Sequence, residues 1–416
     1  MTAEVSATNP FVTTSSAAAS RRRLSIGFLN WAHALDHFVI LIYPTVVIEL
    51  ELTYKDSYSQ LIALATASFV AFGLFSLPAG WLADRWSRRN MIAAFYGGCG
   101  LSLIAAGLAP SLWMLGIALF VLGVFAAIYH PVGTAMVIES AVQRGRTVAF
   151  NGVCGNLGVA LAAGVTALLT ATLSWRGAFL VPGVVCLATV PFYLWLVPDE
   201  RSHKSARNTS PEVGVSNTVA VVLLGLFALV ALSAGLVFNT LSVALPKIVD
   251  ERIPGISLLA VGGLTTAVFI CGAIAQLTVG RLVERFPVHI LFAAMAILQF
   301  VGVIWTVYAS GATLLFALAF TMAAIYGQIT VNDLVIARYT ADAWRGRVYA
   351  VRYFLTFMIS GVAVSMIAVL YSQGGFALVL GVNALVALGF LVAVLAIALI
   401  AQNVEKARAP HAVPAE

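Results

Sequence analysis

The sequence predicts an all-α integral membrane protein with twelve transmembrane helices, arranged as two pseudo-symmetric bundles of six. Three observations lead to this prediction. Hydrophobic residues make up 61% of the 416 residues and charged residues only 10%, whereas soluble domains carry about 25% charged residues. The charged residues gather between long apolar runs, and the first half of the chain matches the second. A soluble fold cannot cover so much apolar surface, so we expect these runs to face lipid or one another.

Apolar runs of membrane-spanning length occur throughout the chain. A helix rises about 1.5 Å per residue and needs about twenty residues to cross a hydrocarbon core of about 30 Å. The twelve predicted spans cover residues 25–48, 58–81, 90–109, 112–137, 148–171, 177–197, 217–246, 257–280, 288–308, 312–336, 348–371 and 376–401.

The basic residues test this count independently. If the N-terminus is cytoplasmic, nineteen of the 23 Lys and Arg residues fall on the cytoplasmic side, as the positive-inside rule requires. The other side then holds Lys55, Arg176, Lys247 and Arg252. We therefore expect a multi-pass protein of the inner cell membrane with both termini in the cytoplasm.

A repeat relates the two halves of the chain. Three pairs of segments match at offsets of 200, 201 and 202 residues: Gly80-Trp81-Leu82-Ala83-Asp84-Arg85 with Gly280-Arg281-Leu282-Val283-Glu284-Arg285, Arg144-Gly145-Arg146 with Arg345-Gly346-Arg347, and Tyr43-Pro44 with Leu245-Pro246. Because each repeat holds an even number of spans, both halves enter the membrane in the same direction. A cavity for a small solute is expected at their interface.

The repeat divides the chain into five parts. We expect a disordered cytoplasmic tail at 1–24, a six-helix bundle at 25–197 and a cytoplasmic linker at 198–216. A second six-helix bundle at 217–401 and a cytoplasmic tail at 402–416 complete the prediction.

Composition also bears on cofactors and partners. The net charge of +6 does not indicate a nucleic-acid partner, because the basic residues lie in the loops between spans. The four cysteines fall inside apolar runs without CxxC spacing, which favours packing over metal binding. We expect no catalytic residue, metal or cofactor. The expected partners are a small-molecule solute, protons and the lipid bilayer, with the chain acting as a monomer.

The loop between the second and third spans carries a family resemblance. Gly80 to Arg89, with the sequence GWLADRWSRR, resembles the signature loop of the major facilitator superfamily. The resemblance extends over the twelve spans and the repeat, and it implies a transporter that works by alternating access. Three features resemble the fosmidomycin-resistance-like branch: His33 to Pro44, Tyr129-His130-Pro131, and Arg144-Gly145-Arg146 followed by Gly155-Asn156-Leu157-Gly158. This second resemblance implies proton-coupled efflux of a small polar or amphiphilic compound.

The first predicted span holds the candidates for proton coupling. Asn30, His33 and His37 recur at three- and four-residue steps, so they share one helix face with Asp36 beside it. An ionised carboxylate inside the bilayer costs several kcal/mol unless it is paired or faces water. We therefore expect Asp36 to carry the coupling proton, with His33 or His37 as its partner. The alternative is a structural Asp–His hydrogen bond that only holds two helices together.

Candidate solute contacts come from both halves. In this family the fourth and tenth helices are expected to line the cavity, and they carry Tyr129, His130, Tyr326 and Gln328 at equivalent depths. The set also includes His37 and its pseudo-symmetric counterpart Asn239. The alternative for these side chains is polar packing between helices. Glu139, Asp333 and Arg338 lie near the membrane boundary, where salt bridges are expected.

The signature loop and its copy are the candidates for conformational gating. A carboxylate that pairs with a neighbouring arginine can hold one access state closed until the pair breaks. The predicted gating residues are Gly80, Asp84, Arg85, Arg88, Arg89, Gly280, Glu284 and Arg285. The alternative is that the arginines only determine topology.

In the fifth span Gly152, Gly155 and Gly158 recur at three-residue steps, which predicts close helix packing.

Several function classes remain beside proton-driven export. Proton-driven uptake of a small organic acid or metabolite is the alternative within transport, and the fifth span lacks the Gly-Pro of the typical antiporter motif. A membrane enzyme would need His33, Asp36, His37 and His130 as metal ligands, but no second carboxylate cluster or HExxH spacing accompanies them. A channel would need a filter-like re-entrant segment, and the sequence shows none. A non-transporting receptor of the same fold remains an alternative.

Overall fold

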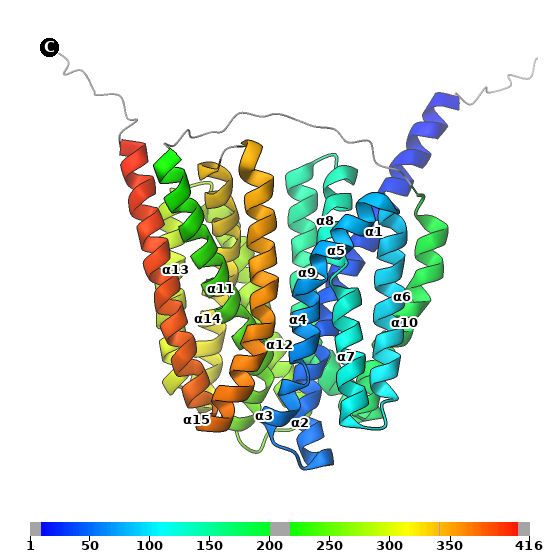
Figure 1. Cartoon of the computed structure of the whole chain (residues 1–416), viewed down its shortest axis with the longest axis vertical. Coiled ribbons are helices and arrows are strands. Elements are labelled where there is room, and N and C mark those ends of the chain that lie inside the picture. The colour runs from blue at the N-terminus through cyan, green and yellow to red at the C-terminus, as the bar shows by residue number, and fades with distance from the viewer. Residues whose placement is uncertain (1–9, 200–216, 341, 407–416) are drawn as a thin grey trace, which may run out of the picture.

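The computed structural model describes residues 10–199, 217–340 and 342–406, and within these ranges the chain forms helices and short connections without strands (Figure 1). The helices are α1 (Pro10–Ile40), α2 (Ile42–Tyr54), α3 (Tyr58–Ala63), α4 (Thr66–Leu74), α5 (Ser76–Arg85), α6 (Arg88–Gly107), α7 (Leu112–Ala126), α8 (Tyr129–Ser140), α9 (Arg144–Leu173), α10 (Trp175–Leu196), α11 (Asn217–Arg252), α12 (Leu258–Leu282), α13 (Val288–Tyr308), α14 (Gly311–Tyr339) and α15 (Asp342–Lys406).

The described helices account for twelve crossings. Nine helical segments are long and apolar enough to span a membrane, and the bent helices α3 to α5 together make a further span. α15 makes two spans, because its backbone leaves the helical conformation at Gly374 and Gly375. The last span consists of α1 and α2, which are separated at Leu41. The predicted all-α fold of two six-span halves is confirmed.

The helix starts follow local chemistry. A serine precedes each of α3, α6, α7 and α12, and its hydroxyl accepts a hydrogen bond from the backbone amide three residues on. This bond satisfies an amide that has no partner inside the helix. Ser57 also forms a full capping box with Gln60. At the bend in α15, Gly375 has φ of +60°, a conformation that glycine adopts without a steric penalty.

The structure differs from two predicted boundaries. α1 begins at Pro10 and so reaches into the predicted disordered tail. The stretch between Pro10 and Leu24 contains three consecutive alanines, which favour helix outside the membrane as well as inside it. α15 ends at Lys406 and so extends into the predicted C-terminal tail. The rest of that tail lies outside the described residues from position 407, and the predicted linker does so from position 200.

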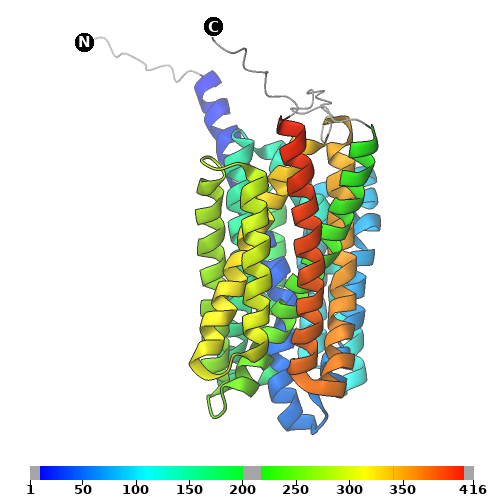
Figure 2. The ribbon, with the colours of Figure 1, turned by 90° about the vertical axis from the view of Figure 1, so that its left-hand side faces the viewer.

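The two ends of the bundle differ in how the halves meet. We call the end at which α1 enters and α15 leaves the terminal face, and the other end the opposite face (Figures 1 and 2). α4 packs on α15 and α9 packs on α12, which brings the first half onto the second. Close backbone approach makes this possible, since a Cβ on Gly73 would lie 2.8 Å from the backbone oxygen of Phe357.

Polar bonds between the halves are unevenly distributed along the bundle. Four occur among the described residues: Glu51 with Lys247, the Gly164 amide with Thr266, Ser360 with the Phe69 backbone oxygen, and Asn156 with Gln276. Of these four, the bond between Asn156 and Gln276 lies nearest the terminal face. Tyr58 adds ring contacts with Tyr371 and Phe376 close to the opposite face. The bundle is therefore held together mainly at its centre and its opposite face.

Candidate functional site

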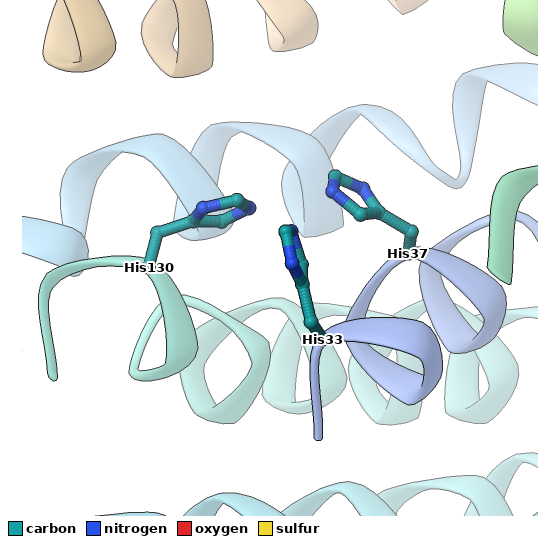
Figure 3. Close-up of side chains that lie close together, drawn as sticks. All are labelled: His33, His37 and His130. Carbon is teal, nitrogen blue, oxygen red and sulfur yellow. The ribbon is translucent and has the colours of Figure 1, made fainter. Parts of the chain in front are cut away.

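Three histidines of the first half lie close together. His33 and His37 lie one turn apart on α1, and His130 lies on α8. The ring centroids are 5.1 Å apart for His33 and His37, 5.3 Å for His33 and His130, and 5.2 Å for His37 and His130. Figure 3 shows the three rings turned toward one another. We call them the histidine cluster. All three side chains are partly accessible.

A buried carboxylate lies beside the histidine cluster. Asp36 is 0% exposed, and its Oδ2 lies 3.2 Å from Nε2 of His130. This separation is that of an ion pair when His130 is protonated. The orientation is not that of a hydrogen bond, and neither carboxylate oxygen has one among the described residues. The pair can hold a proton without leaving a net charge in the membrane interior.

The carboxylate meets a different histidine from those expected. The sequence predicts His33 or His37 as the partner of Asp36, whereas the structure places His130 there. Successive helix residues are rotated by about 100°, so Asp36 lies beside the stripe of His33 and His37 and faces α8. His130 is itself a predicted solute contact, so the proton-coupling candidates and the first-half solute candidates lie together in the structure.

α9 holds His33 in position. The Nδ1 atom of His33 lies 2.8 Å from the backbone oxygen of Asn151, and because a carbonyl only accepts, Nδ1 carries the proton. The side chain of Asn151 also bonds with the hydroxyl of Tyr129 and with Asn30. The ring of Tyr129 stacks on His33 at 4.7 Å. Tyr129, predicted as a solute contact, is instead buried and packs against the ring of His33.

Two glycines let α9 approach α1 this closely. A Cβ on Gly158 would lie 2.0 Å from the backbone oxygen of Ala34, and one on Gly155 would lie 2.5 Å from the His33 ring. Gly152, the third glycine of the predicted stripe, has open space around it. The predicted close packing is therefore confirmed for Gly155 and Gly158, and it is wrong for Gly152.

The second half covers one side of the histidine cluster. Phe357 of α15 lies 4.5 Å from the His130 ring, measured between ring centroids, and also contacts Phe72 of α4. Phe72 in turn contacts His130 at 6.0 Å. The imidazole of His130 thus lies in contact with Phe72 of the first half and Phe357 of the second.

The predicted solute contacts of the second half lie apart from this cluster. Asn239 donates to the backbone oxygen of Gly235 on its own helix. Tyr326 is buried in α14 beside Phe238, and Gln328 is buried with an oxygen that has no described partner. No described hydrogen bond, ion pair or ring contact joins any of these three to the histidine cluster.

The signature loop forms a network of polar bonds in the first half. Arg88 bonds with Asp84, at 2.9 Å, and also with Glu139 of α8. Arg89 donates to the backbone oxygens of Leu194 and Val197 at the end of α10. The network joins α5, α6, α8 and α10 at the terminal face, and it confirms the expected salt bridge of Glu139.

Two further gating candidates make local contacts. Arg85 places its guanidinium 4.1 Å from the ring centroid of Trp81, one turn earlier on α5. Gly80 lies where α5 meets α8, and a Cβ there would be 3.3 Å from the side chain of Pro131.

The copy of this loop in the second half is not bonded in the same way. Among the described residues Glu284 and Arg285 form no ion pair, and Gly280 has open space around it. The reason lies in the sequence, because the positions equivalent to Arg88 and Glu139 hold Val288 and Thr340. Asp333 instead pairs with Arg352 between α14 and α15, as its predicted salt-bridge role requires.

Two residues of the site escape sequence reasoning. Asn151 is a polar residue in an apolar span, a signal that could have identified it, but its partners become visible only in three dimensions. Phe357 is one of 24 phenylalanines, and no pattern in the sequence distinguishes it from the others.

Comparison with known families agrees with this architecture. The family model of the Major Facilitator Superfamily matches residues 26–252, which is more than half of the chain. The match covers the first half, with the histidine cluster and the signature loop, and continues through α11.

Curated relatives match with modest identity. The chain is 31% identical to the puromycin resistance protein pur8 of Streptomyces alboniger over 162 residues, which cover 38% of this chain and 32% of the relative. It is 26% identical to a probable 4-methylmuconolactone transporter of Cupriavidus pinatubonensis over 287 residues, which cover 65% of each protein. The matched region thus spans about a third of the first relative and just under two thirds of the second.

A solved structure shares the fold over nearly the whole chain. A bacterial homolog of the human lysosomal transporter Spinster, in an inward-facing and unoccupied conformation, superposes with a TM-score of 0.76 and 14% identity. The match covers 95% of this chain and 99% of that structure. The two chains have the same fold.

Proposed function

The chain belongs to the major facilitator superfamily, and from this premise we propose that it exports a small solute from the cytoplasm in exchange for protons. The family makes it a multi-pass membrane transporter of a small solute rather than an enzyme. Our proposal adds the coupling ion, the direction and the residues that carry each step. It also places the chain in the inner membrane with the terminal face toward the cytoplasm.

One observation supports proton coupling above the others. Asp36 is fully buried inside a membrane-spanning helix, and its described charge partner is the partly accessible His130. A carboxylate in this position is costly unless its charge is balanced. A proton shared between Asp36 and the histidines balances the charge, and its release costs energy that a bound solute or a change of state can supply. We assign proton coupling to Asp36, His33 and His37, with His130 as the ion-pair partner of Asp36.

The distribution of contacts between the halves supports alternating access. The halves are joined at the opposite face by Glu51 and Lys247 and by the ring contacts of Tyr58. At the terminal face the Asp84–Arg88–Glu139 network stays within the first half. In our proposal this arrangement is the state in which the site opens to the cytoplasm. In this proposal the signature-loop network stabilises the state that opens to the cytoplasm, and it weakens when the halves tilt to the other state.

The solute is proposed to bind between the halves. His37 and His130 contribute partly accessible imidazoles from the first half, and Asn239, Tyr326 and Gln328 contribute polar groups from the second. No described hydrogen bond, ion pair or ring contact joins Asn239, Tyr326 or Gln328 to the histidine cluster in this state, so a solute that touches both groups would link the halves. Such a link is what transport by a tilting motion needs.

Export is favoured over uptake by resemblance. His33 to Pro44 and Tyr129-His130-Pro131, the segments that resemble the fosmidomycin-resistance-like branch, converge on the histidine cluster. One of the curated relatives is a puromycin resistance protein. We therefore propose that the chain belongs to that branch and carries a small polar or amphiphilic compound.

Transport in vesicles tests this proposal. A strain that lacks this protein is first screened for resistance to fosmidomycin and puromycin, and for growth on 4-methylmuconolactone, with and without the gene. The compound that responds is then offered to inverted membrane vesicles that are acidified inside. Export by exchange predicts that the compound accumulates as protons leave the vesicle, and that a protonophore abolishes accumulation.

Two results would overturn the proposal in different ways. Accumulation driven by the reverse gradient, with the compound and protons moving together, would make the protein an uptake symporter. Accumulation that persists after the proton gradient is collapsed, in both vesicle orientations, would remove proton coupling and the role of Asp36 with it.

A further inference from the structure

We propose that His33, His37 and His130 bind one divalent transition metal ion of the Zn²⁺ class, through one imidazole nitrogen each. The inference goes beyond the transport function, because it concerns a ligand of these side chains whichever solute is carried. It rests on the spacing of the rings, the partners of their outer nitrogens and the charge beside them.

The ring spacing matches a tetrahedral metal site. A metal–nitrogen bond of about 2.0–2.1 Å and an imidazole radius of about 1.2 Å place each ring centroid roughly 3.2 Å from the metal, and tetrahedral angles then separate the centroids by about 5.2 Å. The three measured separations are 5.1, 5.2 and 5.3 Å. Three rings from two helices therefore already have the mutual distances that one ion requires.

The nitrogen atoms need an adjustment that the ring centres do not need. One nitrogen from each ring lies within 4.8 Å of the others, whereas two ligands on one tetrahedral ion are about 3.4 Å apart. Rotation about the bond that joins each ring to its side chain moves the nitrogens and leaves the ring centre almost in place. Figure 3 shows that the rings already face a common space, so side-chain rotation without helix movement can close the site.

Two of the rings have an oxygen partner outside the cluster. Nδ1 of His33 bonds with the backbone oxygen of Asn151, and Nε2 of His130 lies beside Asp36. Histidines that bind metals commonly direct their second nitrogen to a carbonyl or carboxylate oxygen, which orients the ring and leaves the other nitrogen for the ion. His33 would thus bind through Nε2 and His130 through Nδ1.

Charge and access favour an ion here. The carboxylate of Asp36 is fully buried, and neither oxygen has a described hydrogen bond. A cation in the cluster would place a fixed positive charge beside it. The imidazoles themselves are partly accessible, which gives an ion a route of entry. Three imidazoles favour zinc, copper, nickel and cobalt over magnesium and calcium. They also leave a fourth position for water or another ligand.

Direct binding measurements test the site. The full chain is purified with its affinity tag removed, because an added histidine tag would itself bind metal. Equilibrium dialysis against Zn²⁺ with elemental analysis is expected to give one ion per chain. Cobalt, which absorbs strongly in tetrahedral and weakly in octahedral sites, is expected to give the tetrahedral spectrum. An excess of Mg²⁺ is expected to leave both results unchanged.

Single variants identify the ligands. His33→Gln, His37→Gln and His130→Gln are each expected to weaken Zn²⁺ binding at least ten-fold and to remove the tetrahedral cobalt spectrum. The matched control is His289→Gln, which removes the buried histidine of α13 and is expected to bind as the native chain does. Size-exclusion profiles and thermal melting of each variant separate loss of a ligand from loss of the fold.

Two outcomes would overturn the inference. In the first, the native chain binds no more Zn²⁺ than a variant in which all three histidines are replaced by glutamine. In the second, the native chain binds cobalt but gives an octahedral spectrum. Neither result depends on solute, pH gradient or direction of transport, so failure of the metal site and failure of the proposed export are distinguishable.

Discussion

Glu51 of α2 and Lys247 of α11 form an ion pair between the two halves of the protein, with Lys247 Nζ 2.7 Å from Glu51 Oε2. Lys247 also pairs with Asp250 on its own helix at 2.8 Å. Both members of the pair between the halves are less than a quarter exposed. The pair therefore stabilises the state in which the opposite face is closed, and it must break when that face opens.

Removal of this pair is expected to favour opening of the opposite face. Lys247→Met should shift the equilibrium between closed and open states by up to about 1 kcal/mol, or roughly five-fold, since partly exposed ion pairs contribute about that much. The distance between spin labels at Leu52 and Leu259, in a variant without the four native cysteines, reports the two populations.

Asp250→Asn provides the matched control. It removes the partner of Lys247 within α11 and keeps the pair between the halves, so the label distances should stay as in the native chain. The exchange Glu51→Lys with Lys247→Glu, made together with Asp250→Asn so that no carboxylate faces the one placed at position 247, should restore the closed population. If Lys247→Met and Asp250→Asn shift the distances equally, the pair between the halves does not hold the face closed.

Asp36→Asn is expected to uncouple transport. The amide has the shape of the carboxylate but cannot release a proton, so accumulation driven by a pH gradient should fall to background while exchange of solute at equal concentrations continues. Both are measured in proteoliposomes with the compound identified by the resistance screen. Asp56→Asn is the control, because it removes a carboxylate between α2 and α3, and it should leave both rates unchanged. Gradient-driven accumulation by the Asp36→Asn protein would show that Asp36 is not part of the coupling step.

Asp84→Asn is expected to change which face is accessible. The variant removes one of the two partners of Arg88 at the terminal face, and so destabilises the state seen here relative to the other. A cysteine at Phe150, whose side chain is 59% exposed on α9, should react several-fold more slowly with a membrane-impermeant maleimide. Glu284→Gln changes the equivalent residue of the second half, which has no described ion pair, and should leave the rate unaltered. Equal rates in native and Asp84→Asn protein would leave the loop with a topological role alone.

Gly158→Ala is expected to destabilise the first half. The added methyl would lie 2.0 Å from the backbone oxygen of Ala34, and overpacking of this kind costs about 1–3 kcal/mol. Gly152→Ala, six residues earlier on α9, meets open space and should be neutral or slightly stabilising, because alanine favours helix over glycine. Thermal melting in detergent compares the two, and equal midpoints would show that α9 can move away from α1 without cost.

The sequence predicts the fold well because length and hydrophobicity determine which segments can span a membrane. It also predicts that His33 and His37 share a face, since a spacing of four residues does so in any helix. It does not predict that Asp36 meets His130, because that depends on how α1 and α8 are rotated against each other. The repeat suggests a second gating loop, but Val288 and Thr340 replace the two residues that would bond it. Contacts between distant segments, such as Phe357 with His130, have no local signal in the chain.

The contact between His130 and Phe357 links the chemistry of the cluster to the position of the halves. The imidazole belongs to one half and its aromatic cover to the other. When the halves separate at this level, water replaces the phenyl ring beside the imidazole. The free-energy cost of placing a positive charge on the imidazole then changes. In the proposed mechanism the position of the halves therefore acts on His130 directly through Phe357, without intermediate residues.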